Sequence, residues 1–222
     1  MELTIKDISS LLMVPEKEIR SLVKKNDIPF QRIDDKELFN KQQIVEWALI
    51  RSLPLNIANH KKMTEYQLWN LNSIFTNESF FYDCDFDEIN YIEQMVLKID
   101  VGNTVDKGII VQLLKNREEL MSTAIGNGIS LPHPRVPLMV GKNKPIINFF
   151  FPKNPLELKS LDGKPVHTII LVISQTIKQH LSLLAQLFFL LSNESFQSAL
   201  VNRKNPQEIL NLIEQIDKPR NQ

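Results

Sequence analysis

Residues 168–173, Thr-Ile-Ile-Leu-Val-Ile, form a continuous apolar run that is rich in β-branched side chains. Such a run is typical of a strand that is buried on both faces of a sheet. Residues 146–151, Ile-Ile-Asn-Phe-Phe-Phe, have the same character apart from one asparagine, and both runs have the length of a single strand. The two runs therefore predict central strands in a sheet that is covered on both sides.

Helical patterns lie on either side of these strands. Thr176 and Gln179 predict a capping box for a helix through Leu191, and Asn205-Pro206 begins the last helix. Upstream, the sequence predicts a helix near residues 65–75 and a strand at 80–82. Asp85 or Asp87 is expected to cap a further helix, which has Ile89, Ile92, Val96 and Ile99 at helical spacing. Thr104 is expected to cap the next helix, in which Val105, Ile109 and Leu113 lie on one face. This alternation predicts an α/β fold with helices packed on a mixed sheet.

Residues 1–50 predict a separate, small and mostly helical domain. Thr4 and Asp7 resemble a capping box, which would begin a helix with Ile8 and Leu12 on its apolar side. The elements expected after it are a second helix at residues 16–25, a hairpin of Phe30–Ile33 and Leu38–Phe39 turned at Asp34-Asp35, and a third helix capped by Asn40. Residues 51–63 show no clear period and contain Pro54, so we expect a linker there and a second domain over residues 64–222.

The composition is that of an ordinary soluble globular protein. Hydrophobic residues make up 43% of the chain, charged residues 23%, and the formal net charge is zero. The lone cysteine, Cys84, excludes an internal disulfide, and no apolar run approaches the ~20 residues that span a bilayer. Together with the absence of a secretory signal pattern, these features predict a cytoplasmic protein that does not contact a membrane.

The segment at residues 116–135 contains the residues that are best suited to a chemical role. Its sequence is Asn-Arg-Glu-Glu-Leu-Met-Ser-Thr-Ala-Ile-Gly-Asn-Gly-Ile-Ser-Leu-Pro-His-Pro-Arg. Gly126 and Gly128 allow the backbone to approach a ligand closely and to point N–H groups at it. His133 lies between two prolines, and a residue before proline favours an extended conformation. The segment therefore predicts an imidazole that is presented on a stiff support.

A histidine suits a transferable phosphoryl group, because its neutral ring nitrogen can attack phosphorus and the resulting bond stays labile. Arg117 offers a planar fork for phosphate oxygens, and His180 lies in the first turn of a predicted helix, where anions are favoured. Each residue alone is also compatible with a role outside catalysis: His133 and His180 as ordinary structural histidines, and Arg117 as a surface charge. His167, at the start of a strand, is expected to make a structural contact.

The run from Arg117 to His133 resembles the active-site segment of the fructose/mannitol-type IIA domain of the bacterial sugar phosphotransferase system, a family that includes the nitrogen-regulatory IIA proteins. The resemblance continues through Leu161–Val166 and His180–Ala185 and covers about residues 64–217. It implies that a histidine phosphocarrier protein phosphorylates His133 and that His180 and Arg117 steady the phosphate. It also implies phosphate contacts from Ser122, Thr123, Gly126 and Gly128, with no cofactor and no metal.

The N-terminal domain resembles the winged helix-turn-helix of excisionase and MerR proteins. This resemblance implies that residues 16–25 form the recognition helix and that Lys17, Arg20 and Lys24 face DNA. Residues 1–50 hold eight basic and nine acidic side chains, a net charge of −1, and the expected wing tip is Asp34-Asp35. Because DNA affinity depends on phosphate neutralisation, the charge predicts weak binding that a homodimer would strengthen.

Three functions stay open from the sequence. The first is a regulator in which phosphorylation of His133 alters DNA binding by residues 1–50. The second is a transport component that passes phosphate to a IIB partner, although the chain has no IIB-type cysteine segment and no membrane domain. The third is a regulator that docks on a target protein through residues 1–50 and does not bind DNA.

The domain organisation gives a first testable prediction. Limited proteolysis should cut near His60-Lys61-Lys62 and release a stable C-terminal fragment, because exposed polar linkers are preferred cleavage sites. Mass spectrometry of the fragments measures the boundary. Resistance of the whole region between residues 50 and 64 would contradict the predicted linker.

Overall fold

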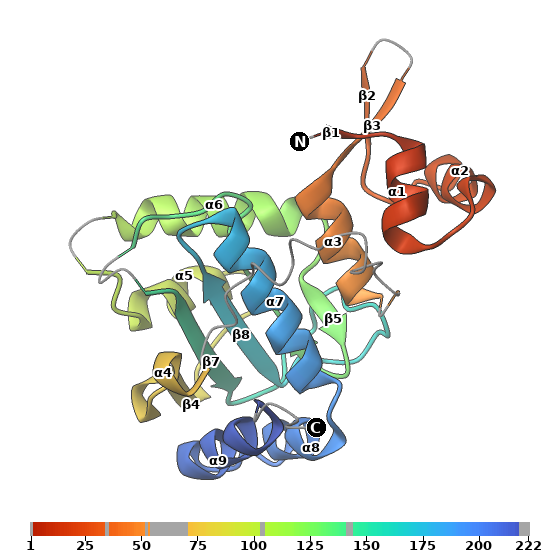
Figure 1. Cartoon of the computed structure of the whole chain (residues 1–222). Coiled ribbons are helices and arrows are strands. Elements are labelled where there is room, and N and C mark those ends of the chain that lie inside the picture. The colour runs from red at the N-terminus through yellow and green to blue at the C-terminus, as the bar shows by residue number, and fades with distance from the viewer. Residues whose placement is uncertain are drawn as a thin grey trace. The chain divides into compact units, whose positions relative to one another are not determined.

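The structure is a computed structural model that describes residues 2–33, 36–51, 53, 71–102, 105–140 and 144–217. These residues fall into two compact units (Figure 1). The first unit contains the described residues as far as Leu53 together with Leu181–Phe188, and the second contains the described residues from Leu71 to His180 and from Phe189 onward. The predicted linker at 51–63 lies almost entirely outside the described residues, so that boundary stays a prediction.

Three helices of the first unit follow the expected signals. They are α1 (Ile5–Leu12), α2 (Glu16–Lys24) and α3 (Lys41–Ile50). The predicted capping box of α1 is confirmed, since the Thr4 hydroxyl accepts a bond from the Asp7 N–H at 3.3 Å and the Asp7 carboxylate accepts one from the Thr4 N–H at 2.8 Å. The Asn40 side chain accepts from the Gln43 N–H at 3.3 Å and so caps α3.

A small antiparallel sheet accompanies these helices. Its strands are β1 (Glu2–Leu3), β2 (Gln31–Ile33) and β3 (Lys36–Asn40), in the order β1-β3-β2. The predicted β2–β3 hairpin is present, whereas β1 was not expected because two residues give no periodic pattern. The turn residues Asp34-Asp35 lie outside the described residues.

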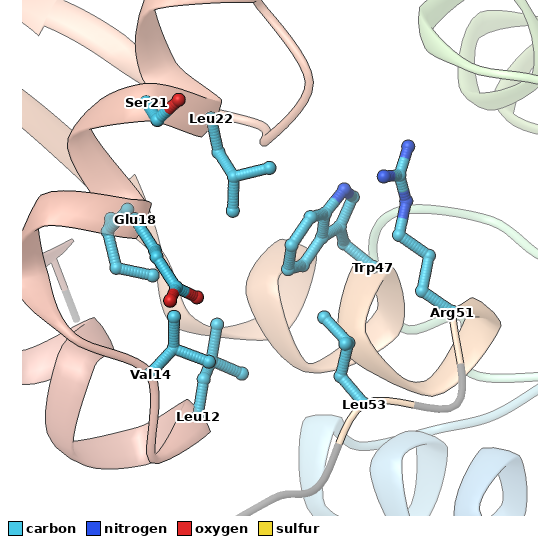
Figure 2. A pocket seen from close by; sticks show the side chains of 9 residues that line it. Leu12, Val14, Glu18, Ser21, Leu22, Trp47, Arg51 and Leu53 are labelled. Carbon is cyan, nitrogen blue, oxygen red and sulfur yellow. The ribbon is translucent and has the colours of Figure 1, made fainter.

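An apolar pocket of about 320 Å³ lies within this unit. Figure 2 shows Leu12, Val14 and Leu22 on one side of it and Trp47 and Leu53 on the other. The Trp47 indole N–H donates to the Asp27 carbonyl at 2.7 Å, which fixes the ring. At the rim, Arg51 forms two hydrogen bonds to the Asp27 carboxylate, at 2.6 and 2.9 Å, and these lower the pKa of that carboxyl.

The second unit is built on a five-stranded mixed sheet. Its strands are β4 (Phe80–Cys84), β5 (Ala124–Gly126), β6 (Ile129–Ser130), β7 (Ile146–Pro152) and β8 (Thr168–Ile173), in the order β4-β7-β8-β6-β5. The β4–β7 and β6–β8 pairs are parallel, and the β7–β8 and β5–β6 pairs are antiparallel. The predicted mixed sheet and its two central strands are therefore confirmed.

Helices alternate with these strands along the chain. They are α4 (Leu71–Ile74), α5 (Tyr91–Lys98), α6 (Lys107–Leu120), α7 (Ile177–Leu191), α8 (Glu194–Val201) and α9 (Pro206–Asp217), with a 3₁₀ turn at Asn77–Ser79. Helix α5 packs on α6, and α9 packs on both α4 and α8. Within the described ranges, no helix combines the length and apolar character that crossing a membrane requires.

Strand β8 is buried on both faces, as its sequence predicts. Ile169, Leu171 and Ile173 belong to an apolar cluster that also contains residues of α5 and α6, while Ile170 and Val172 on the opposite face have no exposed surface. The parallel register of β4 and β7 stacks three aromatic pairs with centroid distances of 4.6–4.9 Å: Phe80–Phe149, Phe81–Phe150 and Tyr82–Phe151. Offset stacking of this kind adds to the stabilisation that burial provides.

Two helix predictions upstream of the site were wrong in detail. Ile89 lies before α5 rather than in it and is 82% exposed, because the Asp87 carboxylate binds the N–H groups of Ile89 and Asn90 in a turn. Helix α6 is capped by Asp106. Its buried positions are Ile110, Leu114 and Arg117, one residue out of phase with the prediction, because adjacent apolar residues in this segment supported two registers.

The core gives a second prediction. Phe149→Ala should lower the free energy of unfolding by about 3–5 kcal/mol, because it leaves a cavity between Phe75 and Phe80. Ile89→Ala is the control and should change it by less than about 0.5 kcal/mol, since that side chain is exposed. Urea denaturation measures both, and equal effects would contradict the assignment of the core.

Candidate active site

Three chain segments meet at one edge of the five-stranded sheet. Strands β6 and β8 are parallel neighbours, so their carboxyl ends reach the same edge. The chain leaves β6 toward His133, and it leaves β8 toward the start of α7, which contains His180. Strand β5 is antiparallel to β6 and starts at this edge, directly after the end of α6, which contains Arg117. The topology thus brings together the three residues that the sequence singled out.

The His133 ring is held in one tautomer. Its Nδ1 lies 2.8 Å from the carbonyl oxygen of Leu131, which can only accept, so Nδ1 bears the proton. Its Nε2 therefore has the lone pair, and it accepts a bond from the Arg117 Nε–H at 3.3 Å. The Pro132 carbonyl accepts from the Val172 N–H at 3.0 Å, which extends the pairing with β8 and fixes the backbone before His133.

Arg117 is positioned by the turn that follows α6. Besides its bond to His133, its guanidinium donates to the Met121 carbonyl at 2.8 Å. The side chain is 5% exposed, and a guanidinium at such a site is paired because an isolated buried charge is costly. Its planar fork, next to the Nε2 atom, can present N–H groups to an anion bound there.

His180 completes the group. Its ring centroid lies 5.0 Å from that of His133, with 49° between the ring planes. The Thr176 cap of α7 positions it: the Gln179 N–H donates to the Thr176 hydroxyl at 3.1 Å, and the His180 N–H donates to the Thr176 carbonyl at 2.9 Å. The His180 N–H is therefore used within the helix, and the imidazole is the group that faces His133.

Ser122 and Thr123 lie beside this group, and both are bonded to Glu118. The Glu118 carboxylate accepts bonds from both hydroxyls, at 2.9 and 2.5 Å, and from the Thr123 N–H at 3.0 Å. Glu118 was not selected from the sequence, because a single acid after an arginine has no distinctive pattern. Direct phosphate contacts from Ser122 and Thr123 stay a prediction.

Gly126 ends β5 and Gly128 directly precedes β6, with Asn127 between them and all three at positive φ. The Asn127 N–H donates to the Asp162 carboxylate at 2.8 Å, which is the main reason that the pKa of this carboxyl is lowered. A Cβ on Gly128 would lie 2.2 Å from the His167 ring, so glycine is required there for close packing. The positive φ angles and the close packing give a structural reason for glycine at both positions. Direct contacts from Gly126 and Gly128 to phosphate stay a prediction.

His167 makes the structural contact that was expected of it. Its Nε2 donates to the Asn127 carbonyl at 3.1 Å and its Nδ1 accepts from the Thr168 hydroxyl at 2.8 Å. Burial is the main cause of its lowered pKa, so the neutral ring is favoured. His167 thus secures the β5–β6 turn and belongs to the support of the site.

The second unit thus combines a mixed sheet with two histidines and an arginine that lie together at the end of its strands. The chain belongs to the family described as "Phosphoenolpyruvate-dependent sugar phosphotransferase system, EIIA 2", whose profile matches residues 73–216. The match starts at residue 73, so this family assignment does not describe residues 1–72, although the profile does cover the Leu181–Phe188 part of the first unit.

Curated relatives agree with this assignment. The fructose-specific EIIABC component of the phosphotransferase system of Bacillus subtilis is 31% identical over 132 residues, which are 58% of this chain and 20% of that protein. The nitrogen regulatory protein homolog of Haemophilus influenzae is 31% identical over 108 residues, 48% of this chain and 65% of that protein. The chain thus spans less than two thirds of the length of either relative.

Solved structures show the same fold. The nitrogen regulatory protein IIA-Ntr from Neisseria meningitidis has a TM-score of 0.57 at 22% identity, covering 64% of this chain and 98% of that one. A IIA domain from Streptococcus pyogenes has a TM-score of 0.52 at 16% identity, covering 68% and 97%. The described part of the second unit therefore has the architecture of these IIA proteins.

The tautomer of His133 gives a third prediction. In long-range ¹H–¹⁵N spectra at a pH where the ring is neutral, His133 should show the Nδ1–H form, because Leu131 offers only an acceptor. Arg117→Ala removes the donor to Nε2 and should shift the population toward the other tautomer. A predominant Nε2–H form in the wild-type protein would contradict this geometry.

Proposed function

We propose that this protein accepts a phosphoryl group on Nε2 of His133 from a histidine phosphocarrier protein and that the phosphorylation state regulates the first unit. The observation that supports this most directly is the Nδ1–H bond to the Leu131 carbonyl, which leaves the Nε2 lone pair as the nucleophile. Membership of the EIIA 2 family agrees with a phosphoryl-transfer role.

In the proposed transfer, the Nε2 lone pair attacks the phosphorus of a phosphohistidine on the donor. The bond from phosphorus to the donor nitrogen breaks as the Nε2–P bond forms, and the donor nitrogen keeps the electron pair. The Nδ1 proton stays on His133, and the Leu131 carbonyl stabilises the positive charge that develops on the ring. No proton has to leave the site during this step.

Arg117 and His180 would act on the phosphoryl oxygens. The bond from Arg117 to Nε2, at 3.3 Å, is longer than the usual range for hydrogen bonds, so its loss costs little when the phosphoryl group arrives. The guanidinium can then donate to phosphate oxygens with favourable geometry. The His180 ring faces His133 and offers a second donor from the start of α7.

The test is incubation with phosphoenolpyruvate, enzyme I and the phosphocarrier protein, followed by intact-mass measurement. One acid-labile phosphate should appear on the wild-type protein and none on His133→Ala. His60→Ala is the matched histidine control and should be phosphorylated like the wild type. A phosphate on His133→Ala would overturn the assignment.

The supporting residues give a fourth prediction. Arg117→Ala and His180→Ala should each slow phosphorylation by about 10²-fold or more, the usual cost of losing one group that stabilises transition-state charge. Rapid-quench measurements of the phosphoprotein give the rates, and circular dichroism checks the fold. Wild-type rates in both variants would show that the phosphate lies elsewhere.

For the first unit, we propose DNA binding through α2. Lys17, Arg20 and Lys24 are exposed, and they lie on the side of the helix away from the buried Ile19 and Val23. Arg20 approaches Glu16 at 3.5 Å, but both side chains are exposed and such pairs contribute little, so the arginine can exchange this partner for a phosphate.

Selection of bound fragments from genomic DNA tests this proposal. Enrichment of a sequence should be lost in Arg20→Ala and kept in Lys6→Ala, a control that removes an exposed base from α1. Binding should weaken with salt, at a slope near −0.9 per phosphate neutralised. Enrichment of no sequence, or enrichment that Arg20→Ala leaves unchanged, would favour a protein-docking role instead.

The pocket in Figure 2 is the observation that favours this docking alternative. It is lined mainly by apolar side chains and includes the Trp47 ring, which suits an apolar side chain of a partner protein. Glu18, at its edge, adds a negative charge, so the matching partner segment would place a basic residue next to its apolar one.

A further inference from the structure

We propose that Glu118 is a positioning residue for His133, acting through the turn after α6 to hold the imidazole in its nucleophilic tautomer. The proposal rests on the proposed role of His133 as phosphoacceptor. Glu118 does not bond to the ring itself, so its effect has to pass through Ser122 and Thr123. Hydrogen bonds form a continuous path between the carboxylate and the ring.

The path begins with the carboxylate. Its two oxygens accept bonds from the Thr123 N–H at 3.0 and 3.1 Å, from the Thr123 hydroxyl at 2.5 Å and from the Ser122 hydroxyl at 2.9 Å. Bonds to an ionised acceptor are stronger than those between neutral groups. Glu118 thus fixes both the backbone and the side chains at the point where the chain turns from α6 toward β5.

The path continues through the backbone to the ring. The Thr123 carbonyl accepts from the Leu131 N–H at 2.9 Å, and the Leu131 carbonyl accepts from the Nδ1–H of His133 at 2.8 Å. A parallel link joins the hydroxyls of Thr123 and Ser130, both buried, at 3.1 Å. Movement of Thr123 would therefore shift the carbonyl that selects the tautomer.

The same turn also positions Arg117. The Arg117 guanidinium donates to the Met121 carbonyl, which belongs to the residue directly before Ser122. Since Glu118 restrains Ser122 and Thr123, it also restrains the position of this carbonyl. The Leu131 carbonyl and the Arg117 Nε–H, which bond to the two ring nitrogens of His133, thus both depend on this turn.

Helix stability does not explain Glu118. It lies in the last turn of α6, where the helix dipole disfavours a negative charge. It is also partly buried, which adds a desolvation cost to the charged form. The neighbouring Glu119 is exposed and has no bond to Ser122 or Thr123 among the described contacts. A negative charge at the end of α6 is therefore not sufficient to restrain the turn.

The test compares Glu118→Gln with Glu119→Gln. A glutamine keeps the size of the side chain but replaces one acceptor by an NH₂ group, which would face the Thr123 donors and break the turn. Glu118→Gln should lower kcat for phosphorylation by on the order of 10²-fold, with the KM for the phosphocarrier protein unchanged, because the turn orients the nucleophile and does not bind the donor. Glu119→Gln should behave as the wild type.

A second readout separates positioning from general damage. In ¹H–¹⁵N spectra, Glu118→Gln should shift His133 toward the Nε2–H tautomer, and Glu119→Gln should not. A wild-type tautomer in Glu118→Gln overturns the proposal whatever the rate, and so does a wild-type kcat. The tautomer measurement does not need phosphorylation, so it tests Glu118 even if the wild-type protein accepts no phosphate and the proposed function fails.

If Glu118→Gln does not fold, Thr123→Val tests the proposal in its place. Valine has the shape of threonine and keeps the backbone N–H for Glu118, but it removes the 2.5 Å bond and the link to Ser130. A folded Thr123→Val protein should show a partial shift of tautomer and a smaller loss of kcat. Wild-type values for both quantities would overturn the proposal.

Discussion

The parallel pairing of β6 with β8 is the contact on which the candidate site depends. Ile129 and Ser130 lie opposite Thr168 and Ile169, and this register places the end of β6 beside the end of β8. Without it, His133 and His180, which are 47 positions apart in the sequence, would share no edge of the sheet. Strand β8 is buried on both faces, so close packing holds it rigidly and thereby fixes the positions of His133 and His180.

Short polar links support the site. Glu118 secures the turn after α6, while Asp162 and His167 secure the turn between β5 and β6. Each link joins a side chain to a backbone group, so the backbone around His133 is fixed at several points. This arrangement explains why a segment that contains glycines at positive φ can still present one ring in one tautomer.

The sequence predicted the parts of the protein whose patterns are local. The apolar runs of β7 and β8 are long and uninterrupted, and the caps at Thr4 and Thr176 depend on residues three positions apart, so both kinds of signal are visible without a structure. The register of α6 was missed, because Ile109-Ile110 and Leu113-Leu114 offered two apolar faces. Burial decides between such faces, and burial depends on the partner helix.

The sequence identified the main residues of the candidate site but not the hydrogen bonds that hold them in place. His133, Arg117 and His180 were selected from the motif and its resemblance, and the structure brings them together. Glu118 was missed, because its role depends on the sharp turn that returns Thr123 to its carboxylate. The β5–β6 hairpin was missed as well, since strands of two and three residues leave no periodic signal.

The edge shared by β6 and β8 also has a consequence for how the protein folds. The chain between these strands has to close a long loop before any of their contacts form, and parallel pairing of distant segments is intrinsically slow. The contacts within the turn after α6 are local and can form early. The contact that brings His133 and His180 together is thus non-local, and it requires the central strands of the sheet to be paired first.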